Sequence, residues 1–362
     1  MIDVLPDRPR KGRGAVSNPT GRFEAEQRLA VADGWTEREM EEEEPVLRTH
    51  VGIDATRSIL NRNDSPDIPF ERSINPYRGC EHGCVYCFAR PTHAYLGLSP
   101  GLDFESRLFA KPKAPELLAN ELRKPNYRCE TLALGMNTDC YQPIERRFEI
   151  TRKILETLDA FGHPVSLVTK STLVLRDLDI LKRMAARRLV KVFVSVTSLR
   201  PEIARTLEPR APHPKHRIAT IRRLAEAGVP VGVMTAPIIP FLTDSEMEKI
   251  LETAAVAGAK EAGYVVLRLP HEVAPLFREW LEANAPGKAR HVMSLVQGMR
   301  GGKDYDSRFF IRRRGTGNYA ELLAKRFELA CRRLELNRKS ISLDRSQFRP
   351  PPIAGEQLDL FS

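Results

Sequence analysis

The chain has 362 residues, of which 42% are hydrophobic, and a formal net charge of +10 from 57 Lys and Arg against 47 Asp and Glu. It contains no run of 18 apolar residues and no apolar segment behind its basic N-terminus, so we expect neither a membrane span nor a secretory signal. A cytoplasmic protein is therefore predicted, in which the cysteines serve as metal ligands, catalytic groups or buried thiols rather than as disulfides. The excess of positive charge favours a polyanionic partner.

Residues 1–65 are predicted to form a polar N-terminal arm. Basic RPRKGRG (8–14) is followed by acidic EMEEEEP (39–45), and few apolar residues accompany them. Such a composition cannot bury enough apolar surface to order the chain by itself. We therefore expect an extended or partly disordered segment ahead of the folded domain.

Short apolar runs alternate with helical segments over residues 66–272. The runs are typical of parallel strands buried on both faces. Between them, Ile150, Ile154 and Leu158 recur on one helical face. Six strands are expected, around residues 73–79, 131–136, 165–170, 190–198, 229–236 and 263–269. This pattern predicts an α/β fold, a partial (β/α)6 TIM-like barrel, with a doubly wound sheet as the alternative. In both architectures the functional site lies at the C-terminal ends of the strands.

Residues 273–345 are predicted to form a helical, basic C-terminal extension. Within it, FFIRRRGTGNYA (309–320) interleaves aromatic residues with arginines, and Arg107, Lys111 and Lys113 add basic residues earlier in the chain. Aromatic and arginine side chains in this arrangement suit a phosphate backbone with stacked or flipped bases. An ordinary basic surface is the alternative interpretation.

Three cysteines, Cys80, Cys84 and Cys87, fall within the stretch CEHGCVYC. A zinc site would need a fourth ligand, for which His82 and His93 are available. A cluster of buried thiols is a second interpretation, although the Gly, Glu and His residues of the stretch suit exposure better. A [4Fe–4S] cluster is the third. Four cysteines are the rule for such clusters, so three leave one iron open to a small molecule.

The CxxxCxxC spacing directly after a first strand, with an aromatic residue before the third cysteine, resembles the signature of the radical SAM superfamily. NPYRGCEHGCVYCFARPTHAYLG (75–97) and LEPRAPHPKHRIATIRRLAEAGVPVGVMTAPIIPFLTD (207–244) resemble the branch related to spore photoproduct lyase. The resemblance implies that Cys80, Cys84 and Cys87 hold a [4Fe–4S] cluster whose open iron binds S-adenosylmethionine. It also implies reductive cleavage to a 5′-deoxyadenosyl radical that abstracts a hydrogen atom from the substrate, with an external reductant.

The resemblance further implies residues that contact S-adenosylmethionine. Tyr86 is expected beside the adenine, with packing under the loop as the alternative. The second strand ends in GMNTDC, which makes Asn137, Thr138 and Asp139 candidates for contact with the amino group. Turn or helix N-cap roles are equally open for these three residues.

Lys170 and Ser195, at the third and fourth strands, match positions that hold the carboxylate and ribose of the cofactor. A lysine that closes an apolar strand is unusual without an anionic partner. Arg210 is expected as a further carboxylate contact because a guanidinium pairs bidentately with that group. An ion pair between Arg210 and Glu208 is the alternative.

One position departs from the family pattern. Spore photoproduct lyase uses a cysteine at the end of the second strand as hydrogen-atom donor, and Met136 occupies that position here. Cys140 and Tyr141 are the candidates to replace it, although a buried structural thiol is an equal interpretation of Cys140. Cys129 and Cys331 are expected in the core.

The C-terminal residues 346–362 are predicted to form a flexible tail behind a PPP spacer. QLDLF within it, residues Gln357, Leu358, Asp359, Leu360 and Phe361, resembles the bacterial motif that docks on the DNA polymerase sliding clamp. Docking of the tail on the protein's own barrel is the alternative.

Together the features predict a radical SAM enzyme that acts on damaged DNA bases. The alternatives are a radical SAM enzyme that modifies RNA or protein, and a zinc-stabilised nucleic-acid-binding protein.

Overall fold

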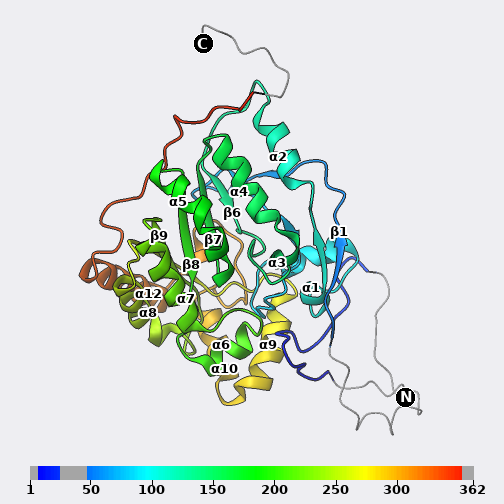
Figure 1. The fold of residues 1–362 in the computed structure, drawn as a ribbon. Coiled ribbons are helices and arrows are strands. Elements are labelled where there is room, and N and C mark those ends of the chain that lie inside the picture. The colour runs from blue at the N-terminus through cyan, green and yellow to red at the C-terminus, as the bar shows by residue number, and fades with distance from the viewer. Residues whose placement is uncertain (1–6, 25–46, 353–362) are drawn as a thin grey trace.

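The computed structural model describes residues 7–24 and 47–352, and a seven-stranded sheet forms its centre (Figure 1). The strands lie in the order β10-β9-β8-β7-β6-β3-β2. All neighbours are parallel except β2, which pairs antiparallel with β3 at the edge. The strands are β2 Leu60–Arg62, β3 Arg72–Ile74, β6 Leu132–Leu134, β7 Val165–Thr169, β8 Val190–Ser195, β9 Val231–Ile238 and β10 Glu261–Val266.

Six parallel strands in chain order confirm the predicted α/β fold with a partial (β/α)6 barrel. Helices cover the outer face of this sheet (Figure 1). Alternation along the strands separates the two faces: Val192 and Val194 are fully buried in the core, whereas Phe193 and Ser195 line cavities on the inner side. The helices and 3₁₀ helices between the strands are α2 Ala114–Leu122, α3 Glu145–Phe148, α4 Ile150–Ala160, η3 Thr172–Asp177, α5 Leu178–Ala186, α6 Pro201–Leu207, α7 Pro214–Glu226, η4 Asp244–Glu246 and α8 Met247–Val256.

A second, three-stranded sheet carries the cysteine loop, which we define as residues 80–87. Its order is β1-β5-β4, with β1 parallel and β4 antiparallel to β5. The single strand expected at 73–79 is divided between the two sheets, and Pro76 lies at the division. The elements of this region are β1 His50–Ile53, β4 Tyr77–Arg78, η2 Arg90–Leu96, α1 Asp103–Ser106 and β5 Arg107–Ala110.

The C-terminal extension closes the free edge of the barrel. Asn337 satisfies backbone groups at the edge of β10. Its side-chain amide pairs with both the N–H and the carbonyl of Ala262, and its backbone N–H donates to the carbonyl of Lys260. Arg326 forms a bidentate ion pair with Glu248 of α8, at 2.7 and 2.8 Å. The helices of the extension are α9 Val273–Asn284, α10 Pro286–Gly298, α11 Ile311–Arg314 and α12 Asn318–Arg333.

Residues 7–24 of the N-terminal arm lie against the region of the cysteine loop. The backbone N–H groups of Gly14 and Ala15 donate to the carboxylate of Glu105 at 3.0 and 2.9 Å, and Arg13 donates to the Glu105 carbonyl at 2.7 Å. The acidic run 39–45 lies outside the described residues. Within the described ranges, no helix has the length and apolar character needed to cross a membrane.

Candidate active site

Two glycines give the cysteine loop its shape. Gly79 and Gly83 adopt left-handed backbone conformations, with φ of 72° and 68°. A Cβ atom on Gly83 would lie 2.6 Å from Glu105 Oε2, and one on Gly79 would lie 2.6 Å from Leu108 Cδ2. Both positions therefore require glycine for conformation and for space.

Two side chains hold the backbone of the cysteine loop in place. Arg90, fully buried, donates to the carbonyls of Cys84 at 2.9 Å and Gly83 at 3.2 Å and pairs with Glu105. On the other side, Gln142 donates to the Gly79 carbonyl at 3.1 Å, and its own carbonyl accepts from the backbone of Glu81 at 2.8 Å. Satisfied buried hydrogen bonds therefore fix the backbone of the cysteine loop.

The three cysteines of the loop all line one cavity, of about 260 Å³, which we call the smaller cavity. Burial raises the pKa of Cys84 to about 12 and raises the pKa values of Cys80 and Cys87. Their thiolate forms therefore need a bound cation beside them. This donor set fits a [4Fe–4S] cluster, which places its thiolates on different irons and does not require them to converge on one point.

The arrangement does not favour the zinc alternative. In the described part of the chain, no three His, Cys, Asp or Glu side chains are grouped closely enough to hold one metal ion. His93 lies with Nε2 2.9 Å from the carbonyl of Arg107 and packs edge-on against Phe104. His82 lines the smaller cavity, and its Nδ1 lies 3.4 Å from Asp139 Oδ2.

The smaller cavity lies at the C-terminal ends of the barrel strands, as predicted. The structure brings six of the sequence-predicted cofactor contacts together in its wall: Tyr86, Asn137, Thr138, Asp139, Lys170 and Ser195. Strand polarity explains this, because the carboxyl ends of parallel strands meet at one edge of the sheet. Met136, the residue that departs from the family pattern, lines the same cavity.

Three predicted residues are placed elsewhere. Arg210 is outside the described lining of the cavity and pairs with Glu81 of the cysteine loop at 2.7 Å, rather than with Glu208. Cys140 and Tyr141 are fully buried and are also outside that lining. The Tyr141 hydroxyl donates to Asp177 at 3.0 Å. Arg210 and Tyr141 are therefore held by polar contacts outside the cavity, and Cys140 is a buried thiol.

Asp139 organises the ends of two strands. Its carboxylate accepts from the backbone of Lys170 and the hydroxyl of Thr169, both at 2.7 Å, and from the backbone of Tyr141 at 2.9 Å. Burial alone would raise its pKa, but His82 and these hydrogen bonds lower it to about 2. Asp139 therefore stays ionised and forms the predicted turn.

A buried carboxylate that the sequence analysis did not assign to the site lies behind the cavity wall. Glu208 has a fully buried side chain and pairs with the buried guanidinium of Arg217. It also accepts from the hydroxyls of Tyr86 and Thr197, and Lys170 Nζ lies 3.9 Å away. Burial acts to raise the pKa of Glu208, but Arg217 and Lys170 lower it to about 2.

This carboxylate positions two cavity residues at once. Lys170 Nζ lies 3.4 Å from Ser195 Oγ and 5.8 Å from the centre of the Tyr86 ring. The ammonium of Lys170 is thus held in the cavity wall beside the tyrosine that is predicted to contact the adenine. Glu208 could have been suspected from its place directly before Pro209 in the family-like stretch, but no spacing rule pairs it with Arg217.

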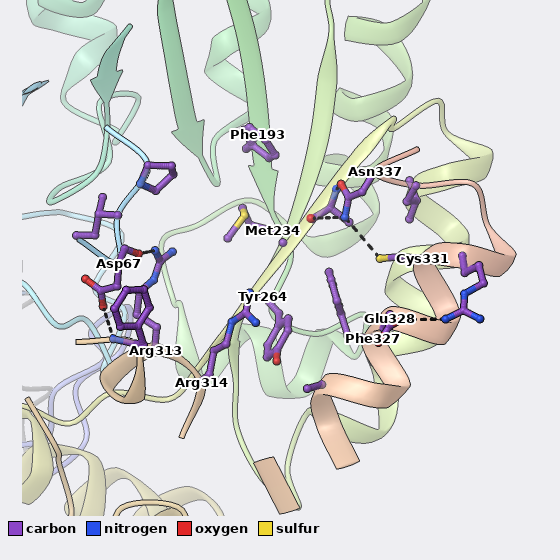
Figure 2. A pocket seen from close by; sticks show the side chains of 18 of the residues that line it. Asp67, Phe193, Met234, Tyr264, Arg313, Arg314, Phe327, Glu328, Cys331 and Asn337 are labelled. Carbon is purple, nitrogen blue, oxygen red and sulfur yellow. Dashed lines mark hydrogen bonds and ion pairs between the residues drawn. The ribbon is translucent and has the colours of Figure 1, made fainter. Parts of the chain in front are cut away.

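A larger cavity of about 1,220 Å³, whose lining is drawn in Figure 2, shares part of its wall with the smaller one. Phe193, Met234 and Tyr264 line it from the inner face of the barrel, while Phe327 and Cys331 line it from α12. The two cavities have Ile68, Met234 and Arg313 in common. Cys331 packs in the core as predicted, and it also contributes to this wall.

The fold and the cysteine-lined cavity suit an enzyme that holds an iron–sulfur cluster. Residues 74–254 match the model of the radical SAM superfamily. An uncharacterized protein of Mycobacterium tuberculosis is 40% identical over 233 residues, which cover 64% of this chain and 68% of the relative. An uncharacterized protein of Methanocaldococcus jannaschii is 30% identical over 213 residues, 59% of this chain and 76% of the relative. The chain belongs to the radical SAM superfamily.

Solved structures of spore photoproduct lyase share this fold. The lyase complexed with dinucleoside spore photoproduct gives a TM-score of 0.54 at 20% identity, over 78% of this chain and 77% of the lyase chain. A mutant of it with bound AdoMet and the same dinucleoside gives 0.51 at 18% identity, with the same coverage.

Enzymes of this superfamily use a [4Fe–4S] cluster and S-adenosylmethionine, and the residues of the smaller cavity fit both groups. Cys80, Cys84 and Cys87 would hold the cluster, and Lys170 with Ser195 would bind polar groups of the cofactor. When bound, the cluster and S-adenosylmethionine together supply a carbon-centred radical that abstracts a hydrogen atom from the substrate. The residues of the smaller cavity would bind and orient both groups.

Proposed function

We propose that this radical SAM enzyme acts on nucleic acid and that its substrate is a damaged base in DNA. The observation that carries the proposal is the larger cavity, which is lined by aromatic and arginine side chains and shares its wall with the cofactor cavity. Aromatic faces stack on bases of any sequence, and arginines bind the phosphates between them.

Three further facts support the proposal. The net charge of +10 favours a polyanion. In addition, the structures with the same fold include spore photoproduct lyase complexed with dinucleoside spore photoproduct, a ligand built of two nucleosides. The volume of the larger cavity, about 1,220 Å³, exceeds the usual range of small-ligand pockets.

The final hydrogen transfer is proposed to differ from that of the lyase. Met136 presents a thioether to the smaller cavity, and a thioether has no S–H hydrogen to donate. Cys140 and Tyr141 remain the proposed donors in the chain, and transfer from either would have to pass through the cavity wall, since both are buried behind it.

Formation of 5′-deoxyadenosine tests the proposal. Anaerobically reconstituted, dithionite-reduced protein is incubated with S-adenosylmethionine and UV-irradiated DNA, undamaged DNA, tRNA or a mixed peptide pool. We expect irradiated DNA to stimulate 5′-deoxyadenosine formation above the other three. A larger stimulation by tRNA or peptide would refute the DNA assignment and favour RNA or protein modification. The Cys84→Ser variant controls for background cleavage.

The tail motif, Gln357 to Phe361, lies outside the described residues. We propose it as the attachment to the DNA polymerase sliding clamp, since its sequence has the apolar anchors of the bacterial docking motif. Such an attachment would bring the enzyme to newly replicated DNA.

A further inference from the structure

Three arginines line the region where the two cavities meet. Arg268 lines the smaller cavity. Arg314 lines the larger cavity and Arg313 lines both, and Figure 2 shows these two side chains. They come from separate elements, since Arg268 follows β10 whereas Arg313 and Arg314 belong to α11. Among the described residues, none of the three forms an ion pair with a carboxylate.

The contacts that these arginines do make leave donor groups free. Arg268 Nη2 donates to the Tyr305 hydroxyl at 3.3 Å, while its buried Nε has no partner among the described residues. The guanidinium of Arg268 lies over the ring of Phe88, 4.7 Å from its centre. Arg313 donates from one nitrogen to the carbonyl of Asp67 at 2.6 Å. Among the described residues, the remaining guanidinium nitrogens of Arg268 and Arg313 form no hydrogen bond, and both side chains line the smaller cavity.

The nearby carboxylates are already engaged. Asp67 is bound by Arg312, with Nε 2.8 Å from Oδ2, and it also accepts from the backbone of Phe310. Asp306 is bound by Arg308 at 2.6 Å. Positive charge therefore exceeds negative charge around the junction of the cavities.

Keeping these cations together costs free energy in the absence of a bound anion. Burial lowers the pKa of Arg313; the Asp67 carboxylate acts to raise it, but the neighbouring Arg268, Arg312 and Arg314 lower it further, so that the net change is downward. The direction of this change means that the surroundings disfavour the charged form. A bound anion would remove the penalty.

We propose that Arg268, Arg313 and Arg314 form a subsite for one phosphodiester group of the substrate, next to the nucleotide that reaches the smaller cavity. This inference rests on the proposed function and adds to it the residues that fix the register of the strand. Guanidinium forks match phosphate oxygens. Phe88, 40% exposed, lies beside Arg268 and offers a face on which the adjoining base can stack.

A single neutral linkage in the substrate provides a direct test. The probes are a 12-nucleotide UV-irradiated single-stranded DNA and versions of it with one methylphosphonate, which carries no charge, at successive positions around the lesion. Binding to the reconstituted protein is measured anaerobically by fluorescence anisotropy over a range of salt concentrations. The variants are Arg314→Gln and the double variant Arg268→Gln/Arg313→Gln, with Arg222→Gln on the exposed face of α7 as control.

At one position, we expect the methylphosphonate to weaken binding by wild type and by the Arg222→Gln control about tenfold. For the double variant, the methylphosphonate at the same position should weaken binding by less than about twofold. The substituted side chains no longer contact that phosphate, so removing its charge costs little more. The slope of log K for DNA binding against the logarithm of salt concentration should also become shallower by about 0.7 in the double variant. Arg314 is exposed, so Arg314→Gln should show a smaller reduction of the methylphosphonate penalty and a smaller change of the salt slope.

Equal losses in wild type and double variant at every position would overturn the subsite while leaving DNA binding intact. No binding of the DNA by wild type would instead overturn the proposed function and the subsite with it. Iron content and the visible spectrum report whether each variant folds. If the double variant loses its iron, the comparison is made with Arg314→Gln, and an unchanged methylphosphonate effect there overturns the proposal. Inorganic phosphate that competes equally well with wild type and with Arg314→Gln would also overturn it.

Discussion

The buried ion pair between Glu208 and Arg217 gives a quantitative prediction about the site. The substitution Glu208→Gln keeps the shape of the side chain and removes its charge. The guanidinium of Arg217, 1% exposed in its side chain, would then lie in the interior without a counter-charge. Tyr86 and Lys170 would lose the carboxylate that positions them.

Two estimates of the loss in folding free energy caused by Glu208→Gln agree. A carboxyl pKa lowered from 4.5 to about 2 corresponds to roughly 3 kcal/mol of stabilisation at neutral pH, at about 1.4 kcal/mol for each tenfold change. Breaking a buried pair by removal of one partner costs about 3–5 kcal/mol. For a chain of this length, 3 kcal/mol lowers the unfolding midpoint by roughly 4 °C.

Thermal unfolding of the reconstituted protein under anaerobic conditions measures this cost, with Glu202→Gln on the exposed side of α6 as the matched control. The stabilisation from Glu208 is complete above its unfolded pKa near 4.5 and is lost as the pH falls toward 2. The difference between wild type and Glu208→Gln should therefore shrink below pH 4.5. A midpoint change no larger than that of Glu202→Gln at pH 7 would refute the reasoning.

Three further predictions concern the cofactors and the tail. Replacing Cys80, Cys84 or Cys87 by serine should lower bound iron from about four per chain to near zero, measured after anaerobic reconstitution; retained iron would contradict their role as ligands. Lys170→Met should keep the iron but weaken S-adenosylmethionine binding at least about tenfold, because a charge-assisted contact is lost; equilibrium dialysis checks this, and unchanged affinity would count against it. Deleting residues 357–362 should abolish binding to the sliding clamp in surface plasmon resonance without changing S-adenosylmethionine cleavage, and unchanged clamp binding would disprove the motif.

The barrel could be predicted from the sequence because its strands are buried on both faces. Runs such as 165–170 and 190–198 are rich in Val and other apolar or β-branched residues, and the structure places β7 and β8 within them. Once the strands are parallel, their carboxyl ends share one edge. That geometry alone brings Lys170 and Ser195 into one cavity wall.

Contacts between distant surface segments could not be predicted in the same way. Residues 8–14 are basic and polar, which indicates no packing, yet Gly14 lies so close to the cysteine loop that a Cβ atom there would be 1.9 Å from the Gly83 carbonyl oxygen. The contact depends on backbone N–H groups and on the buried carboxylate of Glu105. Neither leaves a periodic signal in the sequence.

Arg210 shows why a residue's role is harder to predict than its neighbourhood. Its backbone donates to the carbonyl of His82, so it does lie beside the cysteine loop. Its side chain, however, pairs with Glu81, and Thr49 lies 3.2 Å away. Two carboxylates, Glu81 and Glu208, were within reach of the arginines in this stretch, and only the three-dimensional arrangement assigns Arg210 to one and Arg217 to the other.

The same arrangement separates two functions that a single basic stretch could have served. Arg217, buried behind the wall of the smaller cavity, neutralises Glu208 and so stabilises the cofactor site. Arg268, Arg313 and Arg314 line the cavities themselves, and among the described residues none of them forms an ion pair with a carboxylate. A cation that is already paired adds rigidity, whereas a partly buried cation without a counter-charge gains free energy only when an anion arrives. The distribution of carboxylates, rather than the number of arginines, therefore distinguishes the structural cations of this barrel from those that can bind a phosphate.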